Sequence, residues 1–145
     1  MQANFLGLRL VLFLVRMGYA ILIVDDDPAI GELFGKILVR RGYVPLIVDS
    51  AKEAIDIFRQ QSVDLVLSDL DLPGMNGFQL CGRLKSIRPE VPVVLMTSFG
   101  DRTQGLRAYE EGACYFLSKP LNMDTLLGCV QNLLPDLESS TAQHA

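Results

Sequence analysis

Polar side chains that could do chemistry follow four short apolar segments of the sequence, each at the point where the segment ends. In chain order they are Asp25, Asp26 and Asp27, then Asp69 and Asp71, then Thr97 and Ser98, and finally Ser118 and Lys119. Carboxylates held close together repel one another, so they either stay partly protonated or bind a cation. An oxygen-only cluster without His or Cys favours Mg²⁺, which is usually bound by one or two carboxylates together with phosphate oxygens. These residue types therefore indicate Mg²⁺-dependent phosphoryl transfer, which depends mainly on positioning and charge neutralisation.

Each of these residues also has an ordinary structural explanation when it is considered alone. Three Asp residues after a strand commonly cap a helix and line a solvated loop, and a single Asp at a strand end is usually a turn residue. A single Thr or Lys in such a place is usually incidental. The functional interpretation depends on their joint occurrence at the ends of four segments of the same chain.

The overall composition excludes several classes of protein. The 145 residues include 13 Lys and Arg against 17 Asp and Glu, a formal net charge of −4, which argues against direct nucleic-acid binding through phosphate contacts. The single histidine, His144, excludes a Ser-His-Asp triad, a histidine-rich metal site and a histidine general base. The three cysteines, Cys81, Cys114 and Cys129, form no CxxC pair, which is typical of reduced thiols in a cytoplasmic compartment. We expect all three to pack at core positions.

Five short apolar segments alternate with five segments of helical periodicity from residue 20 onward. The predicted strands are residues 20–24, 44–48, 64–69, 92–97 and 114–118, and the predicted helices begin near residues 28, 51, 78, 102 and 123. Such alternation predicts an α/β fold with a doubly wound five-stranded parallel sheet and five helices. In sheets of this kind, functional groups gather at the carboxyl ends of the strands. The acids, the hydroxyl and the lysine are therefore expected to meet at one edge.

Local signals set the ends and the buried faces of the first and last predicted helices. Pro28 suits the first turn of a helix that ends at Gly42, with Asp26 or Asp27 as its cap, and Asn122 is expected to cap the last helix. The apolar positions expected to face the core are Ile30, Leu33, Phe34, Ile37 and Leu38 in the first helix, and Met123, Leu126, Leu127, Val130, Leu133 and Leu134 in the last.

The two ends of the chain are expected to lie outside the domain, which would span residues 19–135. The apolar run Phe5–Val15 is shorter than the roughly twenty residues that a membrane span needs, and Arg9 lies inside it rather than before it, unlike a secretory signal. We expect residues 1–18 to be an extension, with a short amphipathic anchor or partner-binding helix as the alternative. Residues 136–145 carry too little apolar content to fold and are predicted to be disordered.

From about Tyr19 to Leu134, the chain resembles the receiver domain of two-component response regulators. The segment ILIVDDDPAI is similar to its acidic-pair segment, and DLVLSDLDLPGMNG is similar to its phosphoacceptor segment. The segment VLMTS carries its switch hydroxyl, and GACYFLSKP carries its lysine–proline pair. Four modest motifs in the same order and at matching spacing make a specific signal. The resemblance implies a flavodoxin-like, CheY-like fold.

The resemblance implies a role for each polar residue of the predicted edge. Asp69 would be the phosphoacceptor, a carboxylate nucleophile that becomes an acyl phosphate. Asp26 and Asp69 would bind Mg²⁺, with help from Asp25 through water and from the backbone carbonyl of Asp71. Lys119 would pair with the phosphoryl oxygens.

The resemblance also implies a conformational switch. Thr97 would close onto the phosphoryl group through its hydroxyl, and Phe116 would turn inward as Thr97 moves. An ordinary strand aromatic packed on a helix is the alternative for Phe116. The Lys119–Pro120 bond would be cis, and the small side chain of Ser98 would leave the site open to the phosphoryl donor.

The phosphoryl donor and the output partner would both be other proteins. His144 in a disordered tail is a poor donor, so the source would be a histidine kinase or a phosphotransfer protein. Output would pass through the face of the fourth helix, fifth strand and fifth helix, with Arg107 and Tyr109 as candidate contacts. Asp71 and Phe99 would flank the phosphate entrance and tune dephosphorylation.

Two alternatives remain at this point. A small Mg²⁺-dependent phosphatase of the haloacid-dehalogenase type would use Asp69 as its nucleophile and Asp71 as its general acid. Against it, the other acids precede the nucleophile in the chain, and there is no room for a substrate cap. A pseudo-receiver that only docks is disfavoured by the intact set of Asp25, Asp26, Asp69, Thr97 and Lys119.

Overall fold

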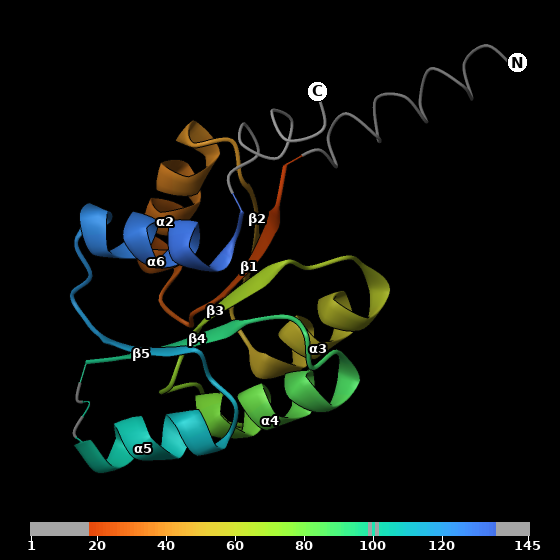
Figure 1. The fold of residues 1–145 in the computed structure, drawn as a ribbon. Coiled ribbons are helices and arrows are strands. Elements are labelled where there is room, and N and C mark those ends of the chain that lie inside the picture. Colours follow the sequence, from red (N-terminus) through yellow and green to blue (C-terminus); the bar gives the residue numbers. More distant parts are fainter. Residues whose placement is uncertain (1–17, 99, 101, 136–145) are drawn as a thin grey trace, which may run out of the picture.

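Five parallel strands form one sheet in the computed structural model, which describes residues 18–98, 100 and 102–135 (Figure 1). The strands are β1 (Ala20–Val24), β2 (Val44–Val48), β3 (Leu65–Asp69), β4 (Val93–Thr97) and β5 (Tyr115–Ser118). Their order across the sheet is β2-β1-β3-β4-β5, and every neighbouring pair is parallel. The predicted doubly wound sheet is confirmed; β3, β4 and β5 each begin one residue later than expected.

Five helices cover the two faces of this sheet in the described part of the chain. They are α2 (Pro28–Arg40), α3 (Ala51–Gln60), α4 (Gly77–Ile87), α5 (Arg102–Glu110) and α6 (Met123–Leu133), labelled as in Figure 1. Helices α2 and α6 lie on one face, and α3, α4 and α5 lie on the other (Figure 1). The sheet is therefore the middle layer of three, and its strands are covered on both sides.

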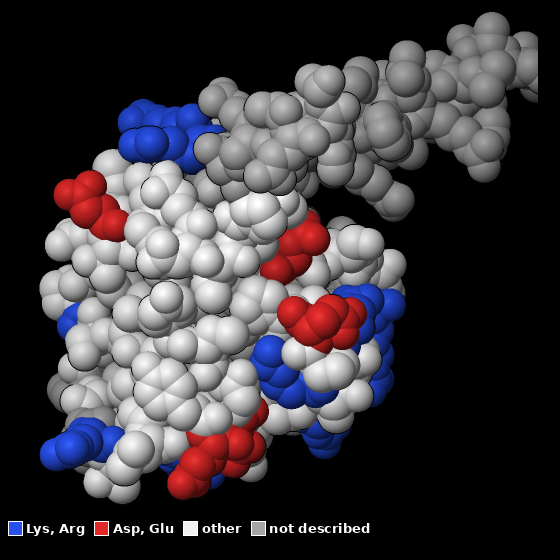
Figure 2. Space-filling model, viewed as in Figure 1, with Lys and Arg blue, Asp and Glu red and all other residues white. Residues whose placement is uncertain are grey.

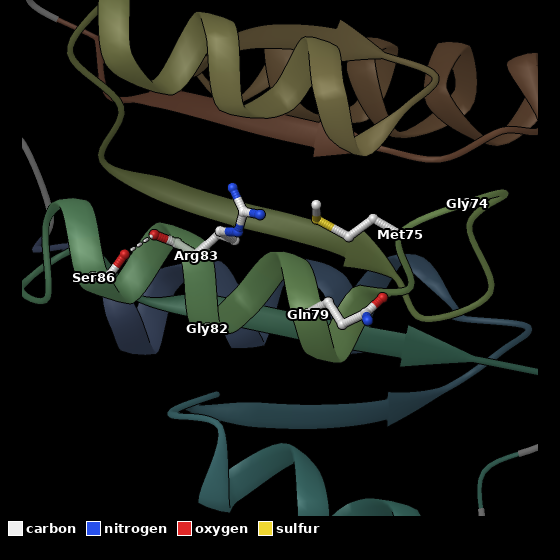
Figure 3. A pocket seen from close by; sticks show the side chains of 6 residues that line it. All are labelled: Gly74, Met75, Gln79, Gly82, Arg83 and Ser86. Carbon is white, nitrogen blue, oxygen red and sulfur yellow. Dashed lines mark hydrogen bonds between the residues drawn. The ribbon is translucent and has the colours of Figure 1, made fainter.

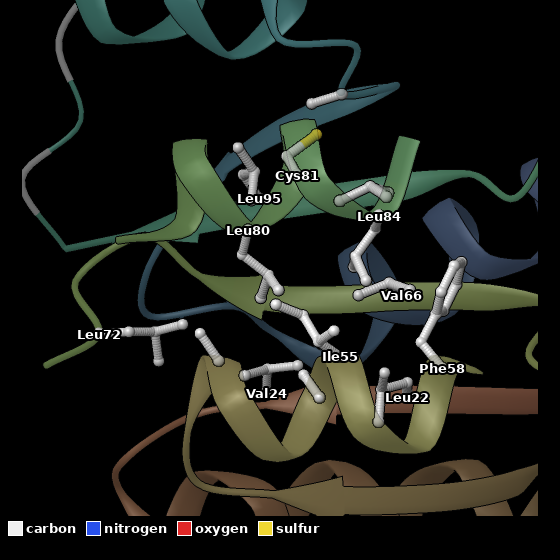
Figure 4. Close-up of a cluster of buried hydrophobic side chains, with 14 of the residues drawn as sticks. Leu22, Val24, Ile55, Phe58, Val66, Leu72, Leu80, Cys81, Leu84 and Leu95 are labelled. Atoms are coloured by element: carbon white, nitrogen blue, oxygen red, sulfur yellow. The ribbon is translucent and has the colours of Figure 1, made fainter. Parts of the chain in front are cut away.

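Burial on both faces explains why the strands read as continuous apolar runs. Successive residues of β1 point to opposite faces, so Leu22 and Val24 pack with α3 and α4, whereas Ile21 and Ile23 pack with α2 and α6. The first of these two clusters contains the fully buried ring of Phe58 (Figure 4). Both clusters hold the sheet rigidly and fix the positions of its strand ends.

Side-chain caps begin four of the described helices, α2, α3, α4 and α6, close to those strand ends. The Asp27 carboxylate accepts a hydrogen bond from the Ala29 N–H at 3.0 Å, so Asp27 rather than Asp26 caps α2. Asn122 caps α6 by accepting from the Thr125 N–H at 2.7 Å. Helix α4 begins with a capping box between Asn76 and Gln79, which the sequence did not predict.

Three residues predicted to be buried are exposed. Leu33 is 51% exposed because α2 packs on β2 through Gly31 and Gly35, where an added Cβ would lie 2.8 and 2.9 Å from atoms of the Ile47 side chain. This close approach turns the buried face of α2 toward its glycines, which an apolar pattern does not count. Met123 is the first residue of α6 and is 50% exposed. Cys114, in the loop just before β5, is also exposed.

The three free thiols should therefore differ in reactivity. Burial raises the pKa of the Cys81 and Cys129 thiols to about 11, so only about one in a thousand is a thiolate at pH 8. In native protein at pH 8, we expect iodoacetamide to modify Cys114 first and the two buried cysteines about 100-fold more slowly, as followed by peptide mass spectrometry. Cys114→Ser should remove the fast reaction, and all three should react alike in denaturant. Rapid native modification of Cys81 would contradict this prediction.

None of the helices in the described ranges is long and apolar enough to cross a bilayer. The predicted extension, except Gly18, and the predicted tail at 136–145 lie outside the described residues, as does Phe99.

Candidate functional site

The predicted functional residues lie at the carboxyl ends of four neighbouring strands. Asp25 directly follows β1, Asp69 ends β3, Thr97 ends β4 and Lys119 directly follows β5. The parallel registers pair Asp69 with Met96 and Thr97 with Ser118, which brings these strand ends to a common level. The chain winds outward in opposite directions from β1 and β3, and such a reversal point is where sheets of this kind bind ligands.

Lys119 joins the two buried carboxylates of the site. Its Nζ lies 2.7 Å from Asp25 Oδ2 and 3.3 Å from Asp69 Oδ2. Burial by itself lowers the pKa of the Lys119 ammonium, but the hydrogen bond that Lys119 donates to Asp25 and the negative charges of Asp25 and Asp69 outweigh burial and raise it. Lys119 is therefore held as a cation against both carboxylates.

The pKa of the Asp69 carboxyl is raised above the ordinary value of Asp. Burial is the largest cause of its raised pKa, and the charge of Asp25 adds to it. The hydrogen bond from the Asp71 N–H to Asp69 Oδ1, at 3.1 Å, and the positive charge of Lys119 oppose this shift. A carboxylate that is poorly solvated and paired with one ammonium group is suited to act as a nucleophile toward an electrophilic phosphorus.

Three carboxylates converge beside Lys119 and form a candidate cation site. One oxygen each from Asp25, Asp26 and Asp69 lie within 4.8 Å of one another, and Asp26 is exposed to solvent. Within the described ranges, this is the one such group of three candidate ligands. The donors are all hard oxygen atoms, which fits Mg²⁺ and does not fit a metal that prefers nitrogen or sulfur.

Thr97 is buried at the end of β4, and its hydroxyl is engaged with a neighbouring loop. Thr97 Oγ1 donates a hydrogen bond to Asp71 Oδ2 at 3.1 Å. The Thr97 backbone carbonyl accepts from the Lys119 N–H at 2.8 Å, which ties the end of β4 to the end of β5. The sequence had indicated a backbone carbonyl ligand and a place beside the phosphate entrance for Asp71, but not this contact of its side chain with Thr97.

Phe116 lies in β5, half-buried, and its ring reaches the neighbourhood of Thr97. A Cβ placed on Gly100 would lie 2.7 Å from Thr97 Cγ2 and 2.9 Å from Phe116 Cε1. A Cβ on Gly105 of α5 would lie 3.5 Å from Phe116 Cδ1. The absence of side chains at these two glycines leaves space for the ring between Thr97 and α5.

Gly77 is a further residue of the site that the sequence did not single out. A Cβ at this position would lie 2.7 Å from the Asp69 carbonyl oxygen and 2.8 Å from Leu70 Cα, both of them backbone atoms. The Gly77 N–H donates to the Leu70 carbonyl at 2.8 Å. The glycine directly after Asn76 is the sequence signal for this close approach.

The Lys119–Pro120 peptide bond is cis, as the resemblance had implied, and Ser98 is exposed beside the site. Among the strand-end acids, Asp27 caps α2, and its backbone N–H donates to Asp25 Oδ1 at 2.9 Å.

The structure also has a hollow away from these residues. It has a volume of about 560 Å³, and its lining includes Met75, Gln79 and Arg83. In Figure 3, Met75, in the loop before α4, and Arg83, in α4, both project toward α3. Its lining contains none of the strand-end acids, so we place the chemistry at the sheet edge instead.

Comparison with known proteins identifies the family. Residues 21–131 match the model of the response regulator receiver domain. The sporulation initiation phosphotransferase F of Bacillus subtilis is 33% identical over 119 residues, which cover 82% of this chain and 96% of that protein. The transcriptional regulatory protein GlrR of Escherichia coli is 32% identical over 121 residues, 83% of this chain and 27% of GlrR. The chain thus spans about a quarter of the length of that regulator.

Solved structures agree with this match. A CheY-like receiver domain protein of Methanospirillum hungatei superposes with a TM-score of 0.79 at 29% identity, covering 85% of this chain and 98% of that one. The chemotaxis protein CheY4 of Vibrio cholerae has a TM-score of 0.77 at 26% identity, covering 81% and 99%. The phosphatase alternative finds no support among these similarities. The chain belongs to the response regulator receiver domain family, whose members act in two-component signalling.

Proposed function

We propose that the chain accepts a phosphoryl group on Asp69 from a histidine kinase or a phosphotransfer protein and then signals to a protein partner. The observation that carries this proposal is the ion pair of Lys119 with both Asp25 and Asp69 at the carboxyl edge of the sheet. It supports the proposal because a buried carboxylate, an ammonium group and the carboxylate oxygens of a candidate cation site lie together there. The family match of residues 21–131 supports the same assignment.

The transfer step follows from these groups. An Asp69 carboxylate oxygen attacks the phosphorus of the phosphohistidine, the P–N bond breaks, and the imidazole leaves with its electron pair as an acyl phosphate forms on Asp69. After the transfer, negative charge lies on the phosphoryl oxygens, and the Lys119 ammonium pairs with them instead of with the carboxylate oxygens. Asp25, Asp26, Asp69 and the backbone carbonyl of Asp71 would hold Mg²⁺, which when bound neutralises charge on the transferred group.

Transmission of the signal is proposed to run through Thr97 and Phe116. The Thr97 hydroxyl would turn toward the new phosphoryl oxygens, and the Phe116 ring would follow. Both the Thr97 methyl group and the Phe116 ring lie against Gly100. Phe116 belongs to β5, and its ring lies against Gly105 of α5. A change at Asp69 can thereby reach the surface of α5.

The output surface is proposed to be the face of α5, β5 and α6. Leu106 and Tyr109 of α5 are large apolar side chains that are more than half exposed. Figure 2 shows that the surface over β5 and α6 carries few charged side chains, which lie mainly at its margins. The Arg107 guanidinium lies 4.4 Å from the centre of the Phe78 ring of α4, so it contributes to the contact between α4 and α5. Tyr109 is the stronger candidate contact.

No direct contact of this chain with nucleic acid is proposed. Relatives such as NtrC are named as DNA-binding transcriptional regulators, and the match covers 24% of NtrC from Klebsiella pneumoniae. We assign any such binding to segments outside the matched part. We propose a cytoplasmic location without membrane association, supported by the three free cysteines.

The proposed function is tested by incubating the full chain with acetyl phosphate and Mg²⁺ and measuring its intact mass. We expect one added phosphoryl group per chain, removed by hydroxylamine because an acyl phosphate reacts with this nucleophile. EDTA should prevent the modification, and Ca²⁺ in place of Mg²⁺ is a matched control for cation charge. Wild-type protein that stayed unmodified by acetyl phosphate, and also failed to bind beryllofluoride, would rule out the proposed function.

A further inference from the structure

The side chain of Asp71 makes a contact that a backbone metal-binding role does not require. Its Oδ2 accepts the hydrogen bond from Thr97 Oγ1 at 3.1 Å, while its backbone N–H donates to Asp69 Oδ1 at 3.1 Å. One residue therefore contacts the phosphoacceptor and the switch hydroxyl at once. It is placed to influence how the two act together.

The contact between Asp71 and Thr97 competes with closure of the switch. A hydroxyl group carries one proton and can donate it to one acceptor at a time. In this structure the hydrogen bond to Asp71 uses that proton, and a carboxylate is a stronger acceptor than a neutral oxygen. A phosphoryl oxygen on Asp69 must therefore take the Thr97 hydroxyl from another anion.

We propose that Asp71 is a positioning residue that holds Thr97 in the unphosphorylated arrangement and so sets how readily phosphorylation closes the switch. The inference rests on the proposed function, because it concerns the response of the same site. It adds that the acid two positions after Asp69 opposes closure through a hydrogen bond to Thr97, beyond any effect of its charge.

The surroundings of Thr97 confine the motion to its side chain. Thr97 is 1% exposed, and its backbone carbonyl accepts a hydrogen bond from the Lys119 N–H at 2.8 Å. Asp71, in contrast, is exposed in the loop between β3 and α4. Rotation of the Thr97 side chain can therefore exchange Asp71 for a phosphoryl oxygen without displacing β4.

The test measures the apparent affinity of the full chain for beryllofluoride in the presence of Mg²⁺, followed by amide NMR signals of α5 and β5. Loss of one hydrogen bond in the unbound state should raise this affinity about 3- to 10-fold in Asp71→Ala. Asp71→Asn keeps an oxygen acceptor and should lack most of the increase. Asp56→Ala, which removes an exposed acid of α3, is the charge-matched control and should equal wild type.

A double-mutant cycle separates the hydrogen bond from charge. In a Thr97→Ala background, Asp71→Ala should produce no further change, because the donor is already absent. An equal increase in Asp71→Asn and Asp71→Ala that persists in this background would assign the effect to charge and overturn the inference. If wild-type protein binds beryllofluoride and Asp71→Ala shows no increase in affinity, the inference is overturned while the proposed function stays intact.

A second measurement does not depend on the Ala variant folding. Three-bond couplings should show one dominant side-chain rotamer of Thr97 in unbound wild-type protein and a different one with beryllofluoride. Rotamer averaging in the unbound protein would contradict the proposed hold of Asp71 on Thr97.

Discussion

Asp69→Asn is expected to abolish stoichiometric phosphorylation by acetyl phosphate, as measured by intact mass in the presence of Mg²⁺. The amide keeps the size of the side chain but removes the nucleophilic carboxylate, so no acyl phosphate can form. It also removes one of the three carboxylates that converge on the candidate cation site. Both losses act in the same direction, and residual modification should fall to the background of the assay.

The matched control for this experiment is Asp56→Asn, which makes the same chemical change at an exposed position of α3. It should be phosphorylated as wild type. The informative contrary result is stoichiometric modification of Asp69→Asn at another acid of the cluster, for which exposed Asp26 is the most accessible candidate. That result would move the phosphoacceptor and falsify the assignment of Asp69.

Lys119→Ala is expected to lower the free energy of unfolding by about 1–3 kcal/mol at pH 7.5 without divalent cations. The variant leaves the buried carboxylates of Asp25 and Asp69 without the ammonium that lies 2.7 and 3.3 Å from them. Urea denaturation followed by circular dichroism measures the loss. Lys36→Ala, at an exposed position of α2, is the matched control and should change stability little.

The pH dependence of this loss follows from the direction of the pKa shifts. Lys119 is one of the groups that lower the pKa of Asp69, so its removal raises that already raised pKa further. A carboxyl with a raised pKa in the folded state destabilises the fold as pH rises through that pKa. The deficit of Lys119→Ala should therefore be greatest at neutral pH and should already shrink above pH of about 4, the ordinary pKa of Asp, as pH falls through the raised pKa of Asp69.

Added Mg²⁺ gives an independent check of the same prediction. A divalent cation that binds the folded carboxylates stabilises the fold by mass action, and it should restore more stability to Lys119→Ala than to Lys36→Ala. A deficit that was constant from pH 4 to 8 and unaffected by Mg²⁺ would show that the loss arises from packing of the Lys119 side chain rather than from charge.

The sequence predicted the parts of the site that depend on topology. Asp25, Asp69, Thr97 and Lys119 each follow an apolar segment, and parallel strands necessarily bring their carboxyl ends to one edge. The structure accordingly places all four there. The sheet itself was predictable for the same reason, since strands buried on both faces leave a clear apolar pattern.

The parts that were missed depend on contacts between distant segments. The hydrogen bond of Thr97 to Asp71 joins residues 26 positions apart, and no local pattern records it. The face of α2 was misjudged at Leu33 because its packing on Ile47 uses glycines. The need for glycine at positions 77 and 100 comes from the atoms that an added Cβ would contact, and these contacts exist only in the folded chain.

The ion pair between Lys119 and Asp25 has a consequence for the protein during its synthesis on the ribosome. Its partners lie 94 positions apart, one directly after the first and the other directly after the last strand of the described sheet. A chain still under synthesis, in which β5 has not yet paired with β4, would have Asp69 without the cation beside it. Under the proposed function, we therefore expect such partly synthesised chains to stay unphosphorylated until β5 docks on β4.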